Sequence, residues 1–389
     1  MKMIDYNHLP VPGPRSSVIG EFPGLYIHVP FCRGKCPYCD FYSVPALSLI
    51  DGWLAGVEQE AAQYRKQFAL FDSLYVGGGT PSVLPVEAFH RLLETLRSRF
   101  EFAADTEVTI ELNPEDGKAA FFKALRSSGV NRLSFGVQSF IDGELAFLKR
   151  RHTARDARVA LEKARSAGLD NISIDLMYLI PGQSEESWVR TLEEALSFEP
   201  AHLSCYQLTC EARTPFGRMK ADGRIAVPDE ETERRFFLLT SRFLRDHGFI
   251  HYEISNFARD EKSISRHNRK YWRHVPYLGL GPAAHSFDGT MRWWNARSVK
   301  TYCRALAAGQ RPVEDSETLT VEQFRLERLY LGLRTREGVP LTDACDGAIP
   351  VAQVASLEKE GLIRIQGDRV LPTTEGYCVA DRLSLMFPG

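Results

Sequence analysis

The strongest constraint on the fold is an alternation of β-rich and helical segments between residue 24 and about residue 255. Six short runs rich in β-branched and aromatic residues begin, in order, at Leu25, Ser73, Glu107, Asn131, Asn171 and His202. Helical patterns lie between most of them, at about 58–67, 86–98, 119–128, 154–167 and 185–198. Two of these patterns end at glycine (Gly129 and Gly168), which suits a helix C-terminus. Alternation of this kind predicts a parallel sheet with helices packed outside it.

The polar signatures of these units fall at the carboxyl ends of the predicted strands. In α/β barrels that end carries the chemistry, so the pattern favours a closed or partly closed (β/α)6 barrel over an open sheet. The chain is predicted to divide into an extended N-terminal arm (1–23), a core barrel (24–255), a loop-rich extension (256–318) and a C-terminal α+β module (319–389). The module's order of helix, strand, turn, strand and helix is winged-helix-like.

Net charge, hydropathy and cysteine content argue against several classes of function. The net charge is −2, and the C-terminal module is not basic, which argues against a nucleic-acid partner. No apolar run approaches the roughly 20 residues that span a bilayer, and the N-terminus lacks the apolar core of a signal peptide, so we expect a cytoplasmic protein. Eight cysteines in 389 residues are too few for a disulfide scaffold.

Three of the cysteines, Cys32, Cys36 and Cys39, follow the first predicted strand with the spacing Cys-x3-Cys-x2-Cys. A zinc site would need a fourth ligand, for which Asp40 and His28 are the nearby candidates. A redox dithiol at Cys36 and Cys39 would leave Cys32 unexplained. A 4Fe–4S cluster held by three thiolates would keep one iron open, as catalytic metal sites do. The spacing favours this third interpretation.

The cysteine spacing, with Tyr38 just before the last cysteine, resembles the radical S-adenosylmethionine (SAM) superfamily. The resemblance implies a 4Fe–4S cluster whose open iron is chelated by SAM, with an electron from the cluster splitting the sulfonium to a 5′-deoxyadenosyl radical. It also implies a protein that reduces the cluster. Five further residues match positions that the superfamily uses to hold SAM: Tyr26, Glu111 and, in the GGGTPS segment, Gly78, Gly79 and Thr80. Without the resemblance, the glycine segment would equally suit a tight strand–helix turn.

Three more residues extend the match: Gln138 in GVQSF, Asp175 in IDLMYLIPGQ, and Arg150 between these two segments. With their spacing they resemble the oxygen-independent coproporphyrinogen III oxidase branch of the superfamily, where the matching residues serve a second SAM site. A capping aspartate and a solvated arginine are the alternatives for Asp175 and Arg150. The resemblance covers residues 24 to 389.

That branch contains an oxidase and a non-enzymatic relative, and two features separate them. The oxidase has a further cysteine two residues after the third, where this chain has Phe41. The segment HNRKYW, which begins at His267, is similar to the HNxxYW motif of HemW-type haem chaperones. Imidazole is a common haem ligand, so His267 is the candidate haem-binding residue, although a lone histidine is more often structural. Arg266, Arg269 and Arg273 could pair with haem propionates or form a solvated rim.

The resemblance therefore implies a haem chaperone of the HemW type, with haem as cargo and no catalytic residue assigned. Such proteins are expected to deliver haem to recipient haemoproteins, including respiratory, membrane-associated ones, and to form a homodimer promoted by the cluster. The alternative is a coproporphyrinogen III oxidase of porphyrin biosynthesis. A radical SAM enzyme acting on an unrelated substrate is a third possibility, because fold and cofactor do not determine the reaction.

Overall fold

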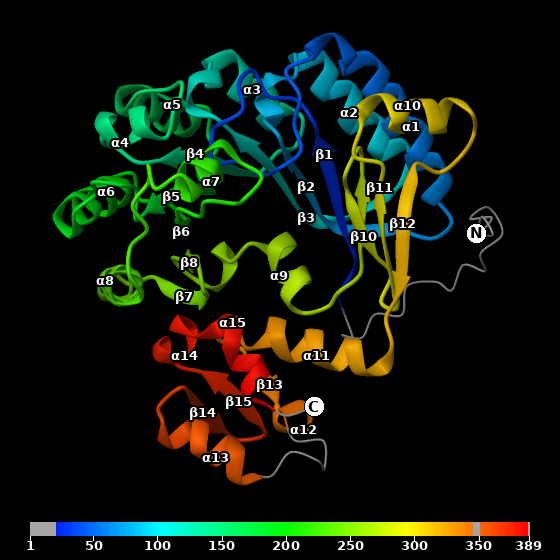
Figure 1. The fold of residues 1–389 in the computed structure, drawn as a ribbon. Helices are drawn as coiled ribbons and strands as arrows, with labels where there is room; N and C mark the ends of the chain where they lie inside the picture. The colour runs from blue at the N-terminus through cyan, green and yellow to red at the C-terminus, as the bar shows by residue number, and fades with distance from the viewer. Residues whose placement is uncertain (1–20, 345–350, 388–389) are drawn as a thin grey trace.

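The computed structural model describes residues 21–344 and 351–387 and has a mixed α/β fold (Figure 1). Six strands form its parallel centre and pair in sequence order: β1 (Gly24–Val29), β2 (Leu70–Gly78), β3 (Glu101–Leu112), β4 (Arg132–Gln138), β5 (Ile172–Tyr178) and β6 (His202–Gln207). The predicted parallel sheet of a mixed α/β protein is confirmed. Most of the predicted N-terminal arm, residues 1–20, lies outside the described residues.

Side chains alternate along the central strands, as the two-residue period of a strand requires. One face is apolar, with Ile27, Val76 and Phe135 fully buried against the helices. The opposite face is polar and carries, for example, Glu111 on β3 and Asp175 on β5. Because polar side chains cover this inner face, the space that it encloses is polar and is not a hydrophobic core.

Eight helices follow or connect these strands: α1 (Ile50–Tyr64), α2 (Val86–Arg99), α3 (Ala119–Ser127), α4 (Asp142–Phe147), α5 (Ala154–Ser166), α6 (Glu185–Ser197), α7 (Pro215–Ala221) and α8 (Glu230–Asp246). Side-chain caps explain where several of them begin. Thr153 and Asp156 form a capping box at α5, and Asp229 accepts a hydrogen bond from the Thr232 N–H at α8.

The segment 256–318, predicted to be rich in loops, is largely regular, so that description was wrong. It contains β8 (Asn256–Ala258), α9 (Arg266–Trp272), β9 (Tyr277–Leu280), β10 (His285–Phe287), β11 (Met291–Asn295), α10 (Val299–Ala307) and β12 (Val313–Thr318). Strands β9 to β12 extend the sheet beyond β1, and β8 and β7 (Ile250–Glu253) extend it beyond β6. Because β9 pairs with β1 in parallel, β1 is an interior strand of a 12-stranded sheet.

A buried carboxylate ties this extension to the first helix. Glu60 on α1 is fully buried and accepts hydrogen bonds from the Tyr302 hydroxyl at 2.6 Å, the Gly281 N–H at 2.9 Å and the Asn295 amide at 2.5 Å. Burial raises the pKa of Glu60 to about 7, although the three donors act in the opposite direction. One side chain thus connects α1, the end of β9, β11 and α10.

The C-terminal elements have a hydrophobic cluster of their own, which includes Leu329, Val354 and Val370. They are α11 (Val321–Gly332), β13 (Val339–Pro340), α12 (Leu341–Ala344), α13 (Val351–Lys359), β14 (Ile363–Gln366), β15 (Arg369–Pro372), α14 (Thr374–Cys378) and α15 (Ala380–Leu383). Strands β13, β15 and β14 form a separate antiparallel sheet, and the group packs below α8 and α9 in Figure 1. Across residues 21–344 and 351–387, no helix has the length and apolar character needed to cross a membrane.

Candidate functional site

A polar cavity of about 660 Å³ opens at the carboxyl ends of the central strands. Ten of the residues singled out from the sequence line it together: Cys32, Cys36, Cys39, Gly78, Gly79, Thr80, Glu111, Gln138, Arg150 and Asp175. They come from the loop after β1 and from the ends of β2 to β5, with Arg150 shortly after α4. Residues far apart in the sequence thus share one space, as the parallel topology requires.

The three cysteines lie on the loop that follows β1 and are partly exposed. The Cys39 N–H donates to the Cys36 carbonyl at 3.1 Å, which closes a tight turn between these two residues. The Cys32 N–H donates to the Val44 carbonyl and fixes the base of the loop. In the described part of the chain, no three His, Cys, Asp or Glu side chains meet closely enough to hold a single metal ion.

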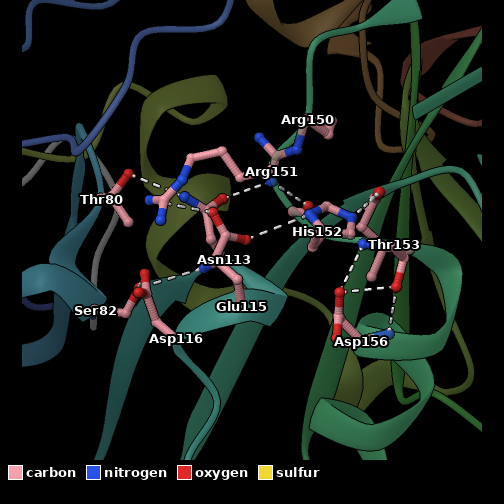
Figure 2. A network of polar contacts seen from close by, with 12 residues as sticks. Thr80, Ser82, Asn113, Glu115, Asp116, Arg150, Arg151, His152, Thr153 and Asp156 are labelled. Atoms are coloured by element: carbon pink, nitrogen blue, oxygen red, sulfur yellow. Dashed lines mark hydrogen bonds and ion pairs between the residues drawn. The ribbon is translucent and has the colours of Figure 1, made fainter. Parts of the chain in front are cut away.

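A chain of polar contacts connects Cys32 with Cys36 through other elements, and Figure 2 labels its three connecting residues, Thr80, Asn113 and Arg150. The Thr80 hydroxyl donates to Cys32 Sγ at 3.2 Å, and the Asn113 amide donates to Thr80 Oγ1 at 3.1 Å. Arg150 Nη2 donates to Asn113 Oδ1 at 2.6 Å, and Arg150 Nη1 lies 3.6 Å from Cys36 Sγ. Three side chains, Thr80, Asn113 and Arg150, therefore hold the two sides of the cysteine loop relative to β3.

The glycine segment packs against the start of the cysteine loop. The Gly79 N–H donates to the Val29 carbonyl at 2.8 Å and the Thr80 N–H to the Phe31 carbonyl at 2.7 Å. A Cβ atom at Gly79 would lie 2.5 Å from the Phe31 oxygen, and Gly78 has a φ of +109°. Glycine is required here by backbone approach and conformation, independently of any ligand.

Two partly buried carboxyl groups face the cavity, and no cationic side chain among the described residues donates a hydrogen bond to either. Glu111 accepts from the Tyr75 hydroxyl at 2.8 Å and the Gly78 N–H at 3.1 Å, and burial raises its pKa to about 7. Asp175 accepts from the Ser134 hydroxyl, and burial raises its pKa as well. Both groups keep acceptor capacity for hydroxyl or ammonium groups of a ligand.

Gln138 ends β4 with a φ of +69°, an uncommon conformation for a residue other than glycine. The pairing of β4 with β5 shifts register between Gly136 and Gln138. A Cβ atom at Gly136 would lie 3.1 Å from the Gln138 amide and 3.5 Å from Arg150, so these two side chains converge over the glycine.

Two of the predicted site residues lie outside this cavity. The Tyr26 hydroxyl is 3.1 Å from His28 Nδ1, and the Tyr26 side chain lines a second cavity instead. His267 is buried on α9, with its Nδ1 3.1 Å from the Ser73 hydroxyl and its Nε2 2.9 Å from the Tyr271 hydroxyl. Burial lowers the pKa of His267 to about 3. In this arrangement both ring nitrogens already have partners, so neither is free to bind iron.

The arginines near His267 are also engaged. Arg266 pairs with Asp105 at 3.0 Å, and Arg273 pairs with Glu337 at 2.5 Å and with Glu21. These two guanidinium groups connect α9 to neighbouring segments, which is a structural role for both side chains.

Comparisons with known proteins bear on this site. Residues 26–195 match the model of the radical SAM superfamily. The "Heme chaperone HemW" of Mycobacterium tuberculosis is 36% identical over 93% of this chain and 94% of its own length, and that of Bacillus subtilis is 34% identical over 94% and 98%. The chain belongs to the HemW family of radical SAM proteins.

The solved structures agree with this assignment. The coproporphyrinogen III oxidase HemN of Escherichia coli, a radical SAM enzyme, matches with a TM-score of 0.82 and 26% identity over 94% of this chain and 90% of HemN. This chain thus shares most of its fold with that oxidase, and the resemblance stated from the cysteine spacing and the strand-end residues is confirmed.

Sequence reasoning missed several cavity residues of this HemW family member. Asn113, Ser134 and Ser204 line the cavity, and so does Arg132, which is 2% exposed. Two Arg132 nitrogens and Arg150 Nε are buried without a hydrogen-bond partner among the described residues. A signal was present, because these residues continue the polar positions of the inner strand faces at two-residue spacing or follow directly after a strand.

Proposed function

We propose that this chain is a haem chaperone that binds haem and passes it to recipient haemoproteins. The observation that carries the proposal is the similarity along nearly the whole chain to proteins named as haem chaperones. Phe41 supports it, because the resembling oxidases have a cysteine at that position. The same proposal includes three further points. The recipients include respiratory haemoproteins at a membrane, the chain forms a homodimer, and the protein is located in the cytoplasm.

The cavity suits the two cofactors that membership of the radical SAM superfamily implies. Cys32, Cys36 and Cys39 would hold a 4Fe–4S cluster, since each thiolate in such a cube binds a different iron and the sulfurs need to face one space rather than meet at one point. When bound and reduced by a partner protein, the cluster supplies an electron and an open iron. Thr80 and Arg150 donate toward Cys32 and Cys36, so these contacts orient both sulfurs.

The rest of the cavity has the polar groups that SAM needs. SAM carries an ammonium, a carboxylate, a sulfonium and ribose hydroxyls. Glu111 and Asp175 offer partly buried acceptors, while Arg132 and Arg150 keep N–H donors that have no hydrogen-bond partner in the described part of the chain. We assign Gly78, Gly79, Thr80, Glu111, Gln138, Arg150 and Asp175 to SAM binding. Tyr26 is a member of this group by resemblance only, because its side chain faces the second cavity.

The division into an arm, a six-unit partial barrel, an extension and a winged-helix-like module is also part of the proposal. The separate C-terminal cluster and the order α13, β14, β15 and α14 support the last of these units.

The test is a paired assay with the full-length protein after anaerobic reconstitution. One arm adds haem and then an apo-haemoprotein, and the other adds coproporphyrinogen III, SAM and a reductant. We expect a stable haem complex that transfers haem and no protoporphyrinogen. The fold shared with HemN makes the oxidase the second candidate. Protoporphyrinogen formation would replace the chaperone proposal with that activity.

A further inference from the structure

A second cavity, of about 650 Å³, lies beside the cysteine loop and is open to solvent. Its lining comes from β1, the end of the cysteine loop, α9 and the strands β9 to β12: Tyr26, His28, Asp40, Phe41, Tyr42, Tyr271, Tyr277, Ala283, His285, Trp294, Asn295, Arg297 and Glu314. The volume falls within the range of cavities that bind cofactor-sized ligands. More than half of these side chains carry a flat aromatic or imidazole ring, which suits a planar ligand.

His285 on β10 is exposed in this cavity. Its ring stacks on Trp294 of β11 with a centroid separation of 5.7 Å and an interplanar angle of 27°. Among the described residues, none hydrogen-bonds the His285 ring, whereas the other described histidines each have a ring nitrogen in a hydrogen bond or ion pair. Partial burial lowers the pKa of His285, and Arg292 acts in the same direction. A neutral imidazole with a free nitrogen is the form that binds iron.

Phe41 and Arg297 add an apolar and a cationic contact. Phe41 is 71% exposed, which is unusual for so large an apolar side chain, and together with Asp40 it lines both the cysteine cavity and this one. The Arg297 guanidinium lies over the Tyr42 ring at 5.7 Å, and it makes no ion pair within the described residues. The other charged lining residues, Glu314 and Asp40, are acidic and would repel a carboxylate. Arg297 is therefore the lining residue that can pair with one.

We infer that this second cavity binds the haem, with His285 as the iron ligand, Trp294 and Phe41 against the macrocycle and Arg297 toward a propionate. The inference rests on the proposed function, because it places the cargo of a haem chaperone. It replaces His267, whose ring nitrogens are engaged, with a histidine of the same region whose nitrogens are free. It also places the haem next to the cysteine loop, with Phe41 between the two cavities.

The experiment is a titration of the full-length protein with ferric haem, followed by the Soret band and by electron paramagnetic resonance. His285→Ala should bind haem about tenfold more weakly or worse, equivalent to roughly 1.4 kcal/mol of binding free energy, and should lose the spectrum of a nitrogen-ligated iron. Added imidazole should restore that spectrum in His285→Ala. The exposed His247→Ala is the matched control and should behave as the parent protein.

The outcomes separate this inference from the proposed function. If the parent protein does not bind haem, the chaperone proposal itself fails. If the parent protein binds haem and His285→Ala gives the same spectrum and affinity, the chaperone proposal stands and the second cavity is not the haem site. A folded His267→Gln variant that loses the nitrogen-ligated spectrum, while His285→Ala keeps it, would also overturn the inference.

Discussion

At the scale of single residues, Asn113 connects two sides of the cavity, although it was not among the site residues predicted from the sequence. Its amide donates to Thr80 and its carbonyl accepts from Arg150, so one side chain joins the contacts of Cys32 to those of Cys36. Replacement therefore affects the cysteine loop from both sides.

We predict that Asn113→Ala lowers the free energy of unfolding by about 1–3 kcal/mol, because the Arg150 guanidinium loses a charged hydrogen bond in a partly buried place. Asn113→Asp keeps an acceptor for Arg150 and loses only the donor to Thr80, so its loss should be smaller. Urea denaturation of both variants is the measurement. Equal stability of Asn113→Ala and the parent protein would contradict the importance of these contacts.

The buried His267 leads to a prediction about how the stability of the protein depends on pH. Its pKa is about 3 in the folded protein against 6.5 in the unfolded chain, so between these values only the unfolded chain binds the proton. Stability is lost as the pH falls from 6.5 toward 3, by up to about 1.4 kcal/mol per pH unit for this one residue. His267→Gln should show a shallower decrease, measured by urea denaturation at pH 7, 6 and 5. An unchanged slope in His267→Gln would contradict the assignment.

At the scale of secondary-structure elements, the cysteine loop and the glycine segment form one unit. Two backbone hydrogen bonds join the end of β1 to the residues after β2, and the contact leaves no room for a side chain at Gly79. The position of the cysteines thus depends on a neighbouring strand end.

We predict that Gly79→Ala destabilises the protein by about 1–3 kcal/mol, since its Cβ would overlap the Phe31 carbonyl oxygen. The displaced loop should also retain less iron and sulfide after reconstitution. Gly143→Ala on α4 is the control, because nothing lies within 4 Å of its Cβ position. Thermal unfolding and iron analysis of both variants are the measurements; identical behaviour would show that the loop adapts.

The central strands and helices could be predicted from the sequence because hydrophobic runs, helix periods and terminal glycines all agreed. Strands β9 to β12 could not, because they are three to six residues long and lie among aromatic and polar residues without an alternating pattern. The side chains of Glu111, Gln138 and Asp175 line one cavity, and their role in binding SAM stays a prediction. Tyr26 lines the second cavity instead, because β9 pairs with β1 and the strands beyond β1 form that cavity with it; this pairing is a long-range contact.

At the scale of the whole molecule, the stability of the fold does not depend on the three cysteines of the loop. Cys32, Cys36 and Cys39 are partly exposed on a loop and do not belong to the hydrophobic core. Their replacement should therefore remove the cofactor and leave the α/β body intact.

We predict that the triple variant C32A/C36A/C39A unfolds at the same temperature as the parent protein when both are prepared without cofactor. After anaerobic reconstitution the parent should show the visible thiolate-to-iron absorption and the variant should not. Cys303→Ala, a partly exposed cysteine on α10, should retain the absorption. A cluster in the triple variant would remove these cysteines as ligands.

Glu60 has a consequence for how such proteins can be shortened or recombined. A fragment cut after the central strands would lose Gly281, Asn295 and Tyr302 and leave an acid inside an apolar region with no donor beside it. The sequence match to the wider superfamily ends at residue 195, yet a piece that keeps all three donors of Glu60 must reach Tyr302 in α10. The segment shared with the wider superfamily is therefore shorter than the unit that supplies all the hydrogen-bond donors of Glu60, and a transplanted barrel would need the strands beyond β1 carried with it.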